Sequence, residues 1–231
     1  MFFWDPTMIL LIPALIISLW AQAKVQSTFH KYLRVPAVSR LSGAAVARNL
    51  LNGNGAGHVK VEMTSGHLSD HYDPRTRTIR LSPEVFQGSS LAALGVAAHE
   101  AGHALQHEHG YFPLELRNNF APVAQFGSNL AFPILFIGLI LGYTNFAIWG
   151  VYLFAAVVLF QIITLPVEFN ASQRAIALLE SGGYLAKNEV QPTKRVLDAA
   201  ALTYVAAAIT AVLTLLRFML LTRFFGGDDR N

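Results

Sequence analysis

Three long stretches of this chain contain no charged side chain. They cover residues 6–23, 118–167 and 199–216, which are runs of 18, 50 and 18 residues. A helix needs about 20 mostly apolar residues to cross the hydrocarbon core of a membrane. The pattern therefore predicts one membrane-spanning helix in each short run and two in the long run, which a turn at 142–145 divides.

We predict four spans, at residues 6–23, 122–141, 146–166 and 199–216. The first span ends in Ala-Gln-Ala, which is similar to the small-residue cleavage site of a secretory signal. A signal peptide begins with positive charges, however, and Asp5 is the only charged residue before this apolar run. We therefore expect a membrane anchor that is retained.

The polar segment after the first span carries both helix and strand signals. Alternating apolar residues and turn-forming sequences favour short strands, and serines favour the starts of helices. The predicted elements are a helix at 39–51, strands at 59–63 and 78–81, and a helix that follows a cap at Ser89 or Ser90 and ends near Gly110.

Composition agrees with this division into apolar spans and polar segments. Charged residues make up 13% of the chain, against about 25% in soluble proteins. The chain contains no cysteine, which excludes a disulfide scaffold. The formal net charge of +3 does not indicate nucleic-acid binding, because no basic cluster is interleaved with stacking aromatic residues.

Basic residues are concentrated in two segments, and basic loops stay on the cytoplasmic side of a membrane. We therefore expect an outside N-terminus, segments 24–121 and 167–198 inside, and a multi-pass protein of the cytoplasmic membrane. The residues that favour this orientation are Lys24, Lys31, Arg34, Arg40, Arg48, Arg174, Lys187, Lys194 and Arg195.

The strongest chemical signal is a His-Glu-x-x-His motif formed by His99, Glu100 and His103. On a helix the two histidines lie one turn apart, about 40° from each other around the axis, so both can bind one zinc ion. Glu100 stands beside them and can take a proton from the attacking water, as in metalloproteases. The small residues around the motif predict room for metal, water and substrate.

A catalytic zinc needs a third protein ligand, and the sequence offers two candidates. His109 stands ten residues after His99, as in metzincins, but that arrangement needs a glycine where this chain has Gln106. Glu168 is the better candidate, because an acid at the edge of a membrane span is costly unless a metal or charge satisfies it. We expect Glu168 to open a further helix that carries Arg174.

Other polar residues are weaker candidates for the site. His71 lies in a segment, with Asp70, that either leans over the metal site or forms a capped turn. Arg174 and Tyr204 either donate to the oxyanion that forms during hydrolysis or serve as membrane-interface residues. The strand at 78–81 is a candidate sheet edge for pairing with an extended substrate.

The chain resembles the YugP-like family of membrane-bound neutral zinc metallopeptidases. The resemblance implies zinc, peptide-bond hydrolysis and a membrane location. The segments that carry it are LSDHYDPR at 68–75, LS at 81–82, AHEAGHALQ at 98–106, LPVEFNASQR at 165–174 and LDAAALTY at 197–204.

The layout is also similar to that of the gluzincin membrane proteases, in which a glutamate after a later helix completes the metal site. By this resemblance His99, His103 and Glu168 are the ligands of one zinc per chain, and Glu100 is the general base. Such relatives often use an aspartate to orient a histidine, whereas this chain has Asn170 and Ser172 at the corresponding positions. Neutral partners orient an imidazole less strongly.

The predicted fold class is predominantly α: a four-span membrane protein with a small α+β zincin-like catalytic unit at the membrane surface. The predicted parts are an anchor at 1–23, a zincin-like unit at 24–121, a transmembrane hairpin at 122–167, a third-ligand helix and cytoplasmic segment at 168–198, and a last transmembrane helix with a short tail at 199–231.

The predicted function is zinc-dependent hydrolysis of peptide bonds in membrane or membrane-proximal proteins. The alternative is a non-catalytic, metal-binding membrane adaptor or scaffold for another protein. The expected partners are a peptide or membrane-protein substrate and the lipid bilayer, without nucleic acid. A homo-oligomer or a complex with another membrane protein stays open.

Overall fold

The computed structural model describes residues 5–225, so only the end of the tail predicted after the last span, residues 226–231, lies outside the described residues. The chain is mostly helical, with one small sheet. Its elements are η1 (Pro6–Leu10), α1 (Leu11–Leu33), α2 (Gly43–Gly53), β1 (Lys60–Met63), β2 (His71–Asp73), β3 (Thr78–Leu81), α3 (Pro83–Phe86), α4 (Leu91–Glu108), α5 (Phe112–Ile140), α6 (Thr144–Ser181) and α7 (Lys187–Phe225).

Four helical segments are long and apolar enough to cross a membrane, which confirms the predicted number. Each extends beyond its uncharged run. Helix α6 continues through Pro166 into the charged residues that follow it, so Glu168 lies in the same helix as the third span and not in a new one. Polar residues after an apolar run mark the approach to water, and they do not by themselves end a helix.

The described chain divides into two compact units. The helical unit consists of residues 5–21, 116–165 and 203–225, and the mixed unit consists of residues 22–115 and 166–202. The long helices contribute segments to both units. All residues of the predicted zinc site belong to the mixed unit.

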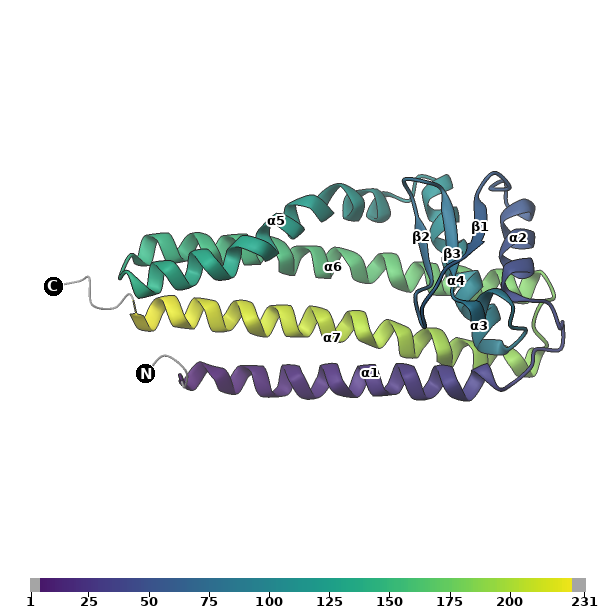
Figure 1. The fold of residues 1–231 in the computed structure, drawn as a ribbon, viewed down its shortest axis with the longest axis horizontal. Coiled ribbons are helices and arrows are strands. Elements are labelled where there is room, and N and C mark those ends of the chain that lie inside the picture. The colour runs from purple at the N-terminus through teal and green to yellow at the C-terminus, as the bar shows by residue number, and fades with distance from the viewer. Residues whose placement is uncertain (1–4, 226–231) are drawn as a thin grey trace. The chain divides into compact units, whose positions relative to one another are not determined.

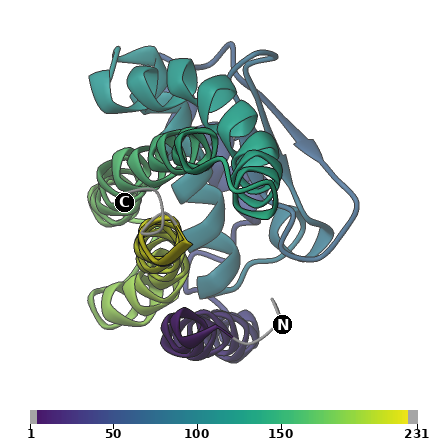
Figure 2. The same ribbon diagram turned by 90° about the vertical axis from the view of Figure 1, so that its left-hand side faces the viewer.

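Within the helical unit, α7 lies between α1 and α6 (Figures 1 and 2). Phe218 of α7 packs against Phe132 of α5 and Phe154 of α6, with ring centroids 4.8 and 4.9 Å away. Ser18 of α1 and Thr210 of α7 share a hydrogen bond of 3.1 Å. Apolar packing and a few interhelical hydrogen bonds are the usual means of holding membrane helices together.

The mixed unit is built on a three-stranded sheet in the order β1-β3-β2, packed with α2, α3 and α4 (Figure 1). Strand β3 runs parallel to β1 and antiparallel to β2. The prediction that 78–81 forms a sheet edge is therefore wrong, because β3 is paired on both sides. The edge that we missed is β2, whose three residues His-Tyr-Asp are too few and too polar to show an alternating pattern.

Serine caps set the starts of the two helices that pack together in this unit. The hydroxyl of Ser42 accepts from the backbone N–H of Ala45, and that of Ser90 accepts from the N–H of Ala93 at 3.1 Å. These bonds satisfy backbone donors that have no partner in the first helical turn. The second cap fixes where α4 begins, and with it the position of the zinc motif along the helix.

We expect Asp5→Asn to lower the free energy of unfolding in detergent by about 1–3 kcal/mol, because it removes a charged hydrogen bond within the helical unit. Asp5 pairs with Arg217 at 3.0 Å, and their side chains are only 17% and 12% exposed. Denaturant titration of the purified chain measures the change. Asp198→Asn is the control: it breaks an exposed pair with Lys194, which contributes less than about 0.5 kcal/mol. Equal effects of the two substitutions would contradict the prediction.

Candidate metal centre

Helix α4 places the two histidines of the motif on one face. His99 and His103 stand one turn apart, with ring centroids 4.7 Å apart and ring planes at 86°. Both belong to the buried side of the helix: the side chain of His103 is 9% exposed and that of His99 is 14% exposed. The imidazoles are thus held close together.

The third donor comes from α6. The Oε2 atom of Glu168 lies 3.3 Å from Nε2 of His99 and 3.4 Å from Nε2 of His103. Two ligand atoms bound tetrahedrally about 2.1 Å from one zinc ion lie about 3.4 Å apart. Among the described residues, this is the one group of three potential metal ligands whose donor atoms come together, within 4.8 Å of one another. The donor set therefore fits a zinc ion.

Hydrogen bonds on the far side of the His103 ring support this assignment. Gln106 donates its amide hydrogens to the backbone oxygen of Val167, at 2.8 Å, and to Oδ1 of Asn170, at 3.0 Å. Its Oε1 then accepts from Nδ1 of His103, 3.0 Å away. With the proton on Nδ1, the lone pair of Nε2 faces the Glu168 carboxylate, and a cation between these two acceptors satisfies both.

The network continues along α6 to a charged residue. Nε of Arg174 donates to Oδ1 of Asn170 at 2.8 Å, and the guanidinium lies 5.8 Å from the centre of the Tyr111 ring. Ser172 stands 3.1 Å from Nδ1 of His99. The two neutral residues that replace an aspartate thus contact the site differently: Ser172 touches a histidine directly, whereas Asn170 acts through Gln106.

Glu100 is buried beside the donor group, on α4. Burial raises the pKa of its carboxyl to about 7; the charge of His99 opposes the rise, and those of Glu168 and Asp70 add to it. A carboxyl with such a pKa can hold or release a proton near neutral pH. Its position and its environment both suit proton transfer.

The charges of Asp70 and His71 influence the pKa of Glu100, although less than burial and the charges of His99 and Glu168 do. Asp70 accepts hydrogen bonds from the backbone N–H of Ser82, at 2.7 Å, and from its hydroxyl. Asp70 thus holds the chain at Ser82, as the capped-turn alternative expected, and the placement of His71 over the metal site stays a prediction. The next residues form strand β2, where Tyr72 hydrogen-bonds His107 of α4 at 2.8 Å.

Two other residues that the sequence suggested for the site, His109 and Tyr204, are not in the group of metal-donor residues. His109 is the exposed residue that follows α4, and it is not in the donor group. Tyr204 belongs to the helical unit, so its part in the reaction stays a prediction. In the sequence Gln106 is notable only because it stands where a metzincin needs glycine, and its link between His103 and α6 depends on a partner 61 positions along the chain.

A glycine inside the zinc motif allows α4 and α6 to approach. A Cβ atom added to Gly102 would lie 2.8 Å from the backbone oxygen of Ala171. No side chain fits there unless the two helices separate. The expectation that the small residues of the motif leave space for substrate is therefore wrong for Gly102, whose space is filled by the α6 backbone.

Comparison with known proteins agrees with this geometry. Residues 7–223 match the model of a family described as "Putative neutral zinc metallopeptidase". The chain belongs to this family. It is also 50% identical, over 96% of its length and 98% of the relative, to a Bacillus subtilis (strain 168) protein named "Putative membrane protease YugP". No solved structure matches the chain.

Membership of the family supports zinc as the metal. The relative is named a membrane protease, and this chain has four helices apolar enough to cross a membrane, so both findings agree with the predicted membrane location. The donor group of two histidines and one glutamate, read from the structure, is the set that catalytic zinc uses in several peptidases. Family membership and site geometry therefore point to the same ion.

Gly102→Ala should lower both stability and zinc content. The added methyl group would push against the backbone of α6, which costs about 1–3 kcal/mol when no flexible side chain can give way, and would move Glu168 away from the histidines. Thermal denaturation and metal analysis of the purified protein measure the two effects. Gly53→Ala is the control, because a Cβ there meets no atom within 4 Å. Full zinc content in the Gly102 variant would contradict the close approach.

Gln106→Leu should lower zinc affinity about 10- to 100-fold, since it removes the group that orients His103. Leucine has a similar size, so the helix should stay folded. Competition with a chelator of known affinity measures the change. Gln125→Leu, which removes an exposed amide hydrogen-bonded to Asn129 on α5, should leave the affinity unchanged. If both variants bind zinc like the original chain, the orienting role of Gln106 is wrong.

Proposed function

We propose that the chain is a zinc-dependent endopeptidase that hydrolyses peptide bonds of membrane or membrane-proximal proteins. The observation that supports this most is the meeting of Nε2 of His99, Nε2 of His103 and Oε2 of Glu168, with Glu100 buried next to them. The first three residues would hold the ion. A catalytic zinc held by three protein ligands would keep a fourth position for water or substrate.

Zinc, when bound, supplies a Lewis acid that polarises a peptide carbonyl and acidifies water. The protein's own part in the reaction falls to Glu100. Its carboxylate takes a proton from the attacking water as the oxygen bonds to the scissile carbon, and it then passes this proton to the leaving amine nitrogen. Because one carboxyl performs both transfers, no second acid is needed.

The remaining polar candidates take different roles in this proposal. We assign Arg174 to positioning, because its guanidinium is held by Asn170 and Tyr111 and reaches His103 only through Gln106. Tyr204 stays a candidate donor to the oxyanion, with no contact assigned.

His71 stays the other candidate donor. Its Nδ1 donates to the backbone oxygen of Ser69 at 2.8 Å. Its Nε2 therefore carries a proton, and can donate to an oxyanion, only when the ring is charged.

Strand β2 offers the surface on which an extended substrate would bind. It is an edge of the sheet, it contacts α4, and its residue Tyr72 is bonded to His107 on the site helix. Pairing with main-chain groups accepts many side chains. The basic residues on the segments that carry the site favour the cytoplasmic side of the membrane. The substrate we propose is thus an extended segment close to the inner membrane surface.

Glu100→Gln should retain zinc and lose peptide hydrolysis by about 100-fold or more, because the amide cannot take up the proton. Turnover of a diverse pool of unstructured peptides by the purified, zinc-loaded chain measures this. Metal analysis of the same preparation shows that the ion is still bound. Undiminished turnover in the variant would exclude the proposed mechanism.

Two further variants separate the metal ligands. Glu168→Ala should lose zinc, whereas His109→Ala should keep it, since His109 lies outside the donor group. A wild-type chain that holds zinc but cleaves no peptide in the pool would instead favour the metal-binding adaptor. The two outcomes are distinguishable in one set of preparations.

A further inference from the structure

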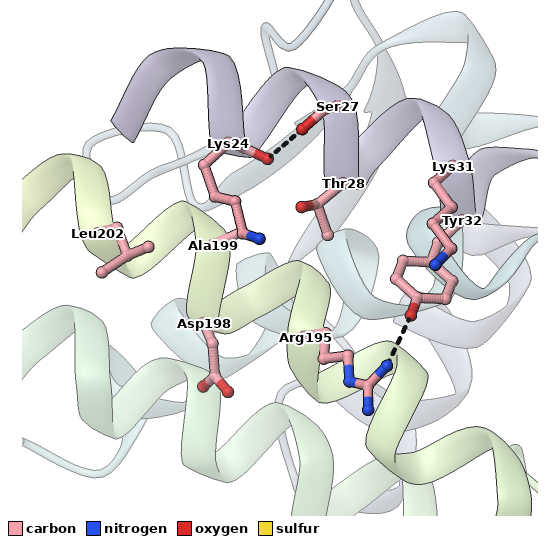
Figure 3. A pocket seen from close by; sticks show the side chains of 9 residues that line it. All are labelled: Lys24, Ser27, Thr28, Lys31, Tyr32, Arg195, Asp198, Ala199 and Leu202. Carbon is pink, nitrogen blue, oxygen red and sulfur yellow. Dashed lines mark hydrogen bonds between the residues drawn. The ribbon is translucent and has the colours of Figure 1, made fainter. Parts of the chain in front are cut away.

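A second site lies away from the zinc ligands, in a cleft of about 440 Å³ between α1 and α7 (Figure 3). All of its lining residues fall within the mixed unit. One wall carries Lys24, Thr28 and Tyr32, which are spaced four residues apart and so share one face of α1. The opposite wall is the face of α7 that carries Arg195 and Ala199. The small side chain of Ala199 leaves room between the helices.

The cleft has an excess of positive charge. Its cations are Lys24, Lys31 and Arg195, and no carboxylate within residues 5–225 forms an ion pair with any of them. Its one acid, Asp198, is already paired with Lys194 at 2.7 Å. Three positive charges therefore face the cleft without a matching negative charge.

Hydroxyl groups lie among these cations. Arg195 reaches the Tyr32 hydroxyl at 3.5 Å, and the Lys31 ammonium lies 5.3 Å from the centre of the Tyr32 ring. Figure 3 shows the side chains of Lys24 and Thr28 pointing from α1 towards α7. Arginine, lysine and hydroxyl groups together are the donors that proteins use to bind phosphate oxygens.

The position of the cleft along both helices indicates which class of phosphate compound it would bind. On α1 the uncharged run ends at residue 23, and Lys24 is the first cation after it. On α7 the uncharged run begins at residue 199, directly after Asp198. Both helices therefore change from charged to apolar residues within the cleft, and Leu202 lines its apolar end. A phospholipid makes the same change from headgroup to acyl chain at the membrane interface.

We propose that this cleft binds an anionic phospholipid, with its phosphate among Lys24, Lys31 and Arg195 and the start of an acyl chain against Ala199 and Leu202. Basic clefts between membrane helices commonly hold such headgroups, and each cation near an anionic membrane adds to the attraction. A zwitterionic phospholipid carries its own cation and gains less from the three positive charges.

Bound lipid would add to the direct contact that Arg195 of α7 makes with Tyr32 of α1. Helix α7 also packs on α4, where a Cβ atom added to Gly95 would lie 3.0 Å from the Thr193 side chain. Restraint of α7 should therefore be measurable as resistance of the mixed unit to unfolding, because a ligand that binds the folded state stabilises it. This readout does not depend on peptidase activity or on zinc.

The test is thermal denaturation of the full chain in detergent micelles, with phosphatidylglycerol, phosphatidylcholine or inorganic phosphate added in separate arms. We expect phosphatidylglycerol to raise the midpoint temperature in a saturable manner, and the other two additions to raise it much less. Equal stabilisation by phosphatidylcholine would show a general lipid effect and overturn the proposal. Full stabilisation by inorganic phosphate would identify a free-anion site and overturn the lipid assignment.

The variant Lys24→Gln/Lys31→Gln/Arg195→Gln should weaken binding of phosphatidylglycerol at least about tenfold, measured from the lipid concentration at half-maximal stabilisation. The control is Lys60→Gln/Arg75→Gln/Lys187→Gln, which removes the same charge from exposed positions outside the cleft. Equal losses in both variants would assign the effect to net charge and overturn the site. Circular dichroism and zinc content show whether the cleft variant is folded; if it is not, the single variants Lys24→Gln and Lys31→Gln replace it.

Discussion

The zinc site depends on how closely α4 and α6 approach. At Gly102 the backbone of α6 takes the space that any side chain would fill, with the oxygen of Ala171 2.8 Å from where a Cβ would stand. This contact brings Glu168 to within 3.4 Å of both histidines. A zinc ion tolerates only small changes in ligand distance. The packing of α4 against α6 therefore determines whether the three side chains can bind the same ion. The motif needs its glycine for this reason as much as it needs its histidines.

Neutral hydrogen bonds hold His103 in place, a task that a carboxylate performs in many zinc sites. Gln106 can donate and accept at once, so it orients His103 while it joins α4 to the backbone of α6. An aspartate would raise the basicity of the imidazole more strongly, but it would add a second buried negative charge near Glu168. With the Gln106 amide in this place, the site near the membrane contains one buried negative charge fewer than it would with an aspartate.

Helices that continue past their apolar runs supply both of the sites described. The extension of α6 carries Glu168 and the residues that hold Gln106 in place, and the extensions of α1 and α7 form the basic cleft. Proteolysis near a bilayer and recognition of an anionic lipid are compatible in one chain, because both proposed sites lie where long helices pass from apolar to charged residues.

The sequence by itself determined the four spans, the strand at 78–81 and the zinc motif, and it limited the cap of α4 to Ser89 or Ser90, because periodicity, apolar length and local capping are properties of neighbouring residues. It also singled out Glu168, as an acid next to a span. Only the tertiary structure decided that β3 is the central strand and β2 an edge, that α6 runs on through Pro166, and that Gln106 and Gly102 contact α6 beside the candidate metal ligands. Each of these features rests on contacts between segments far apart in the chain, whose partners no local pattern specifies.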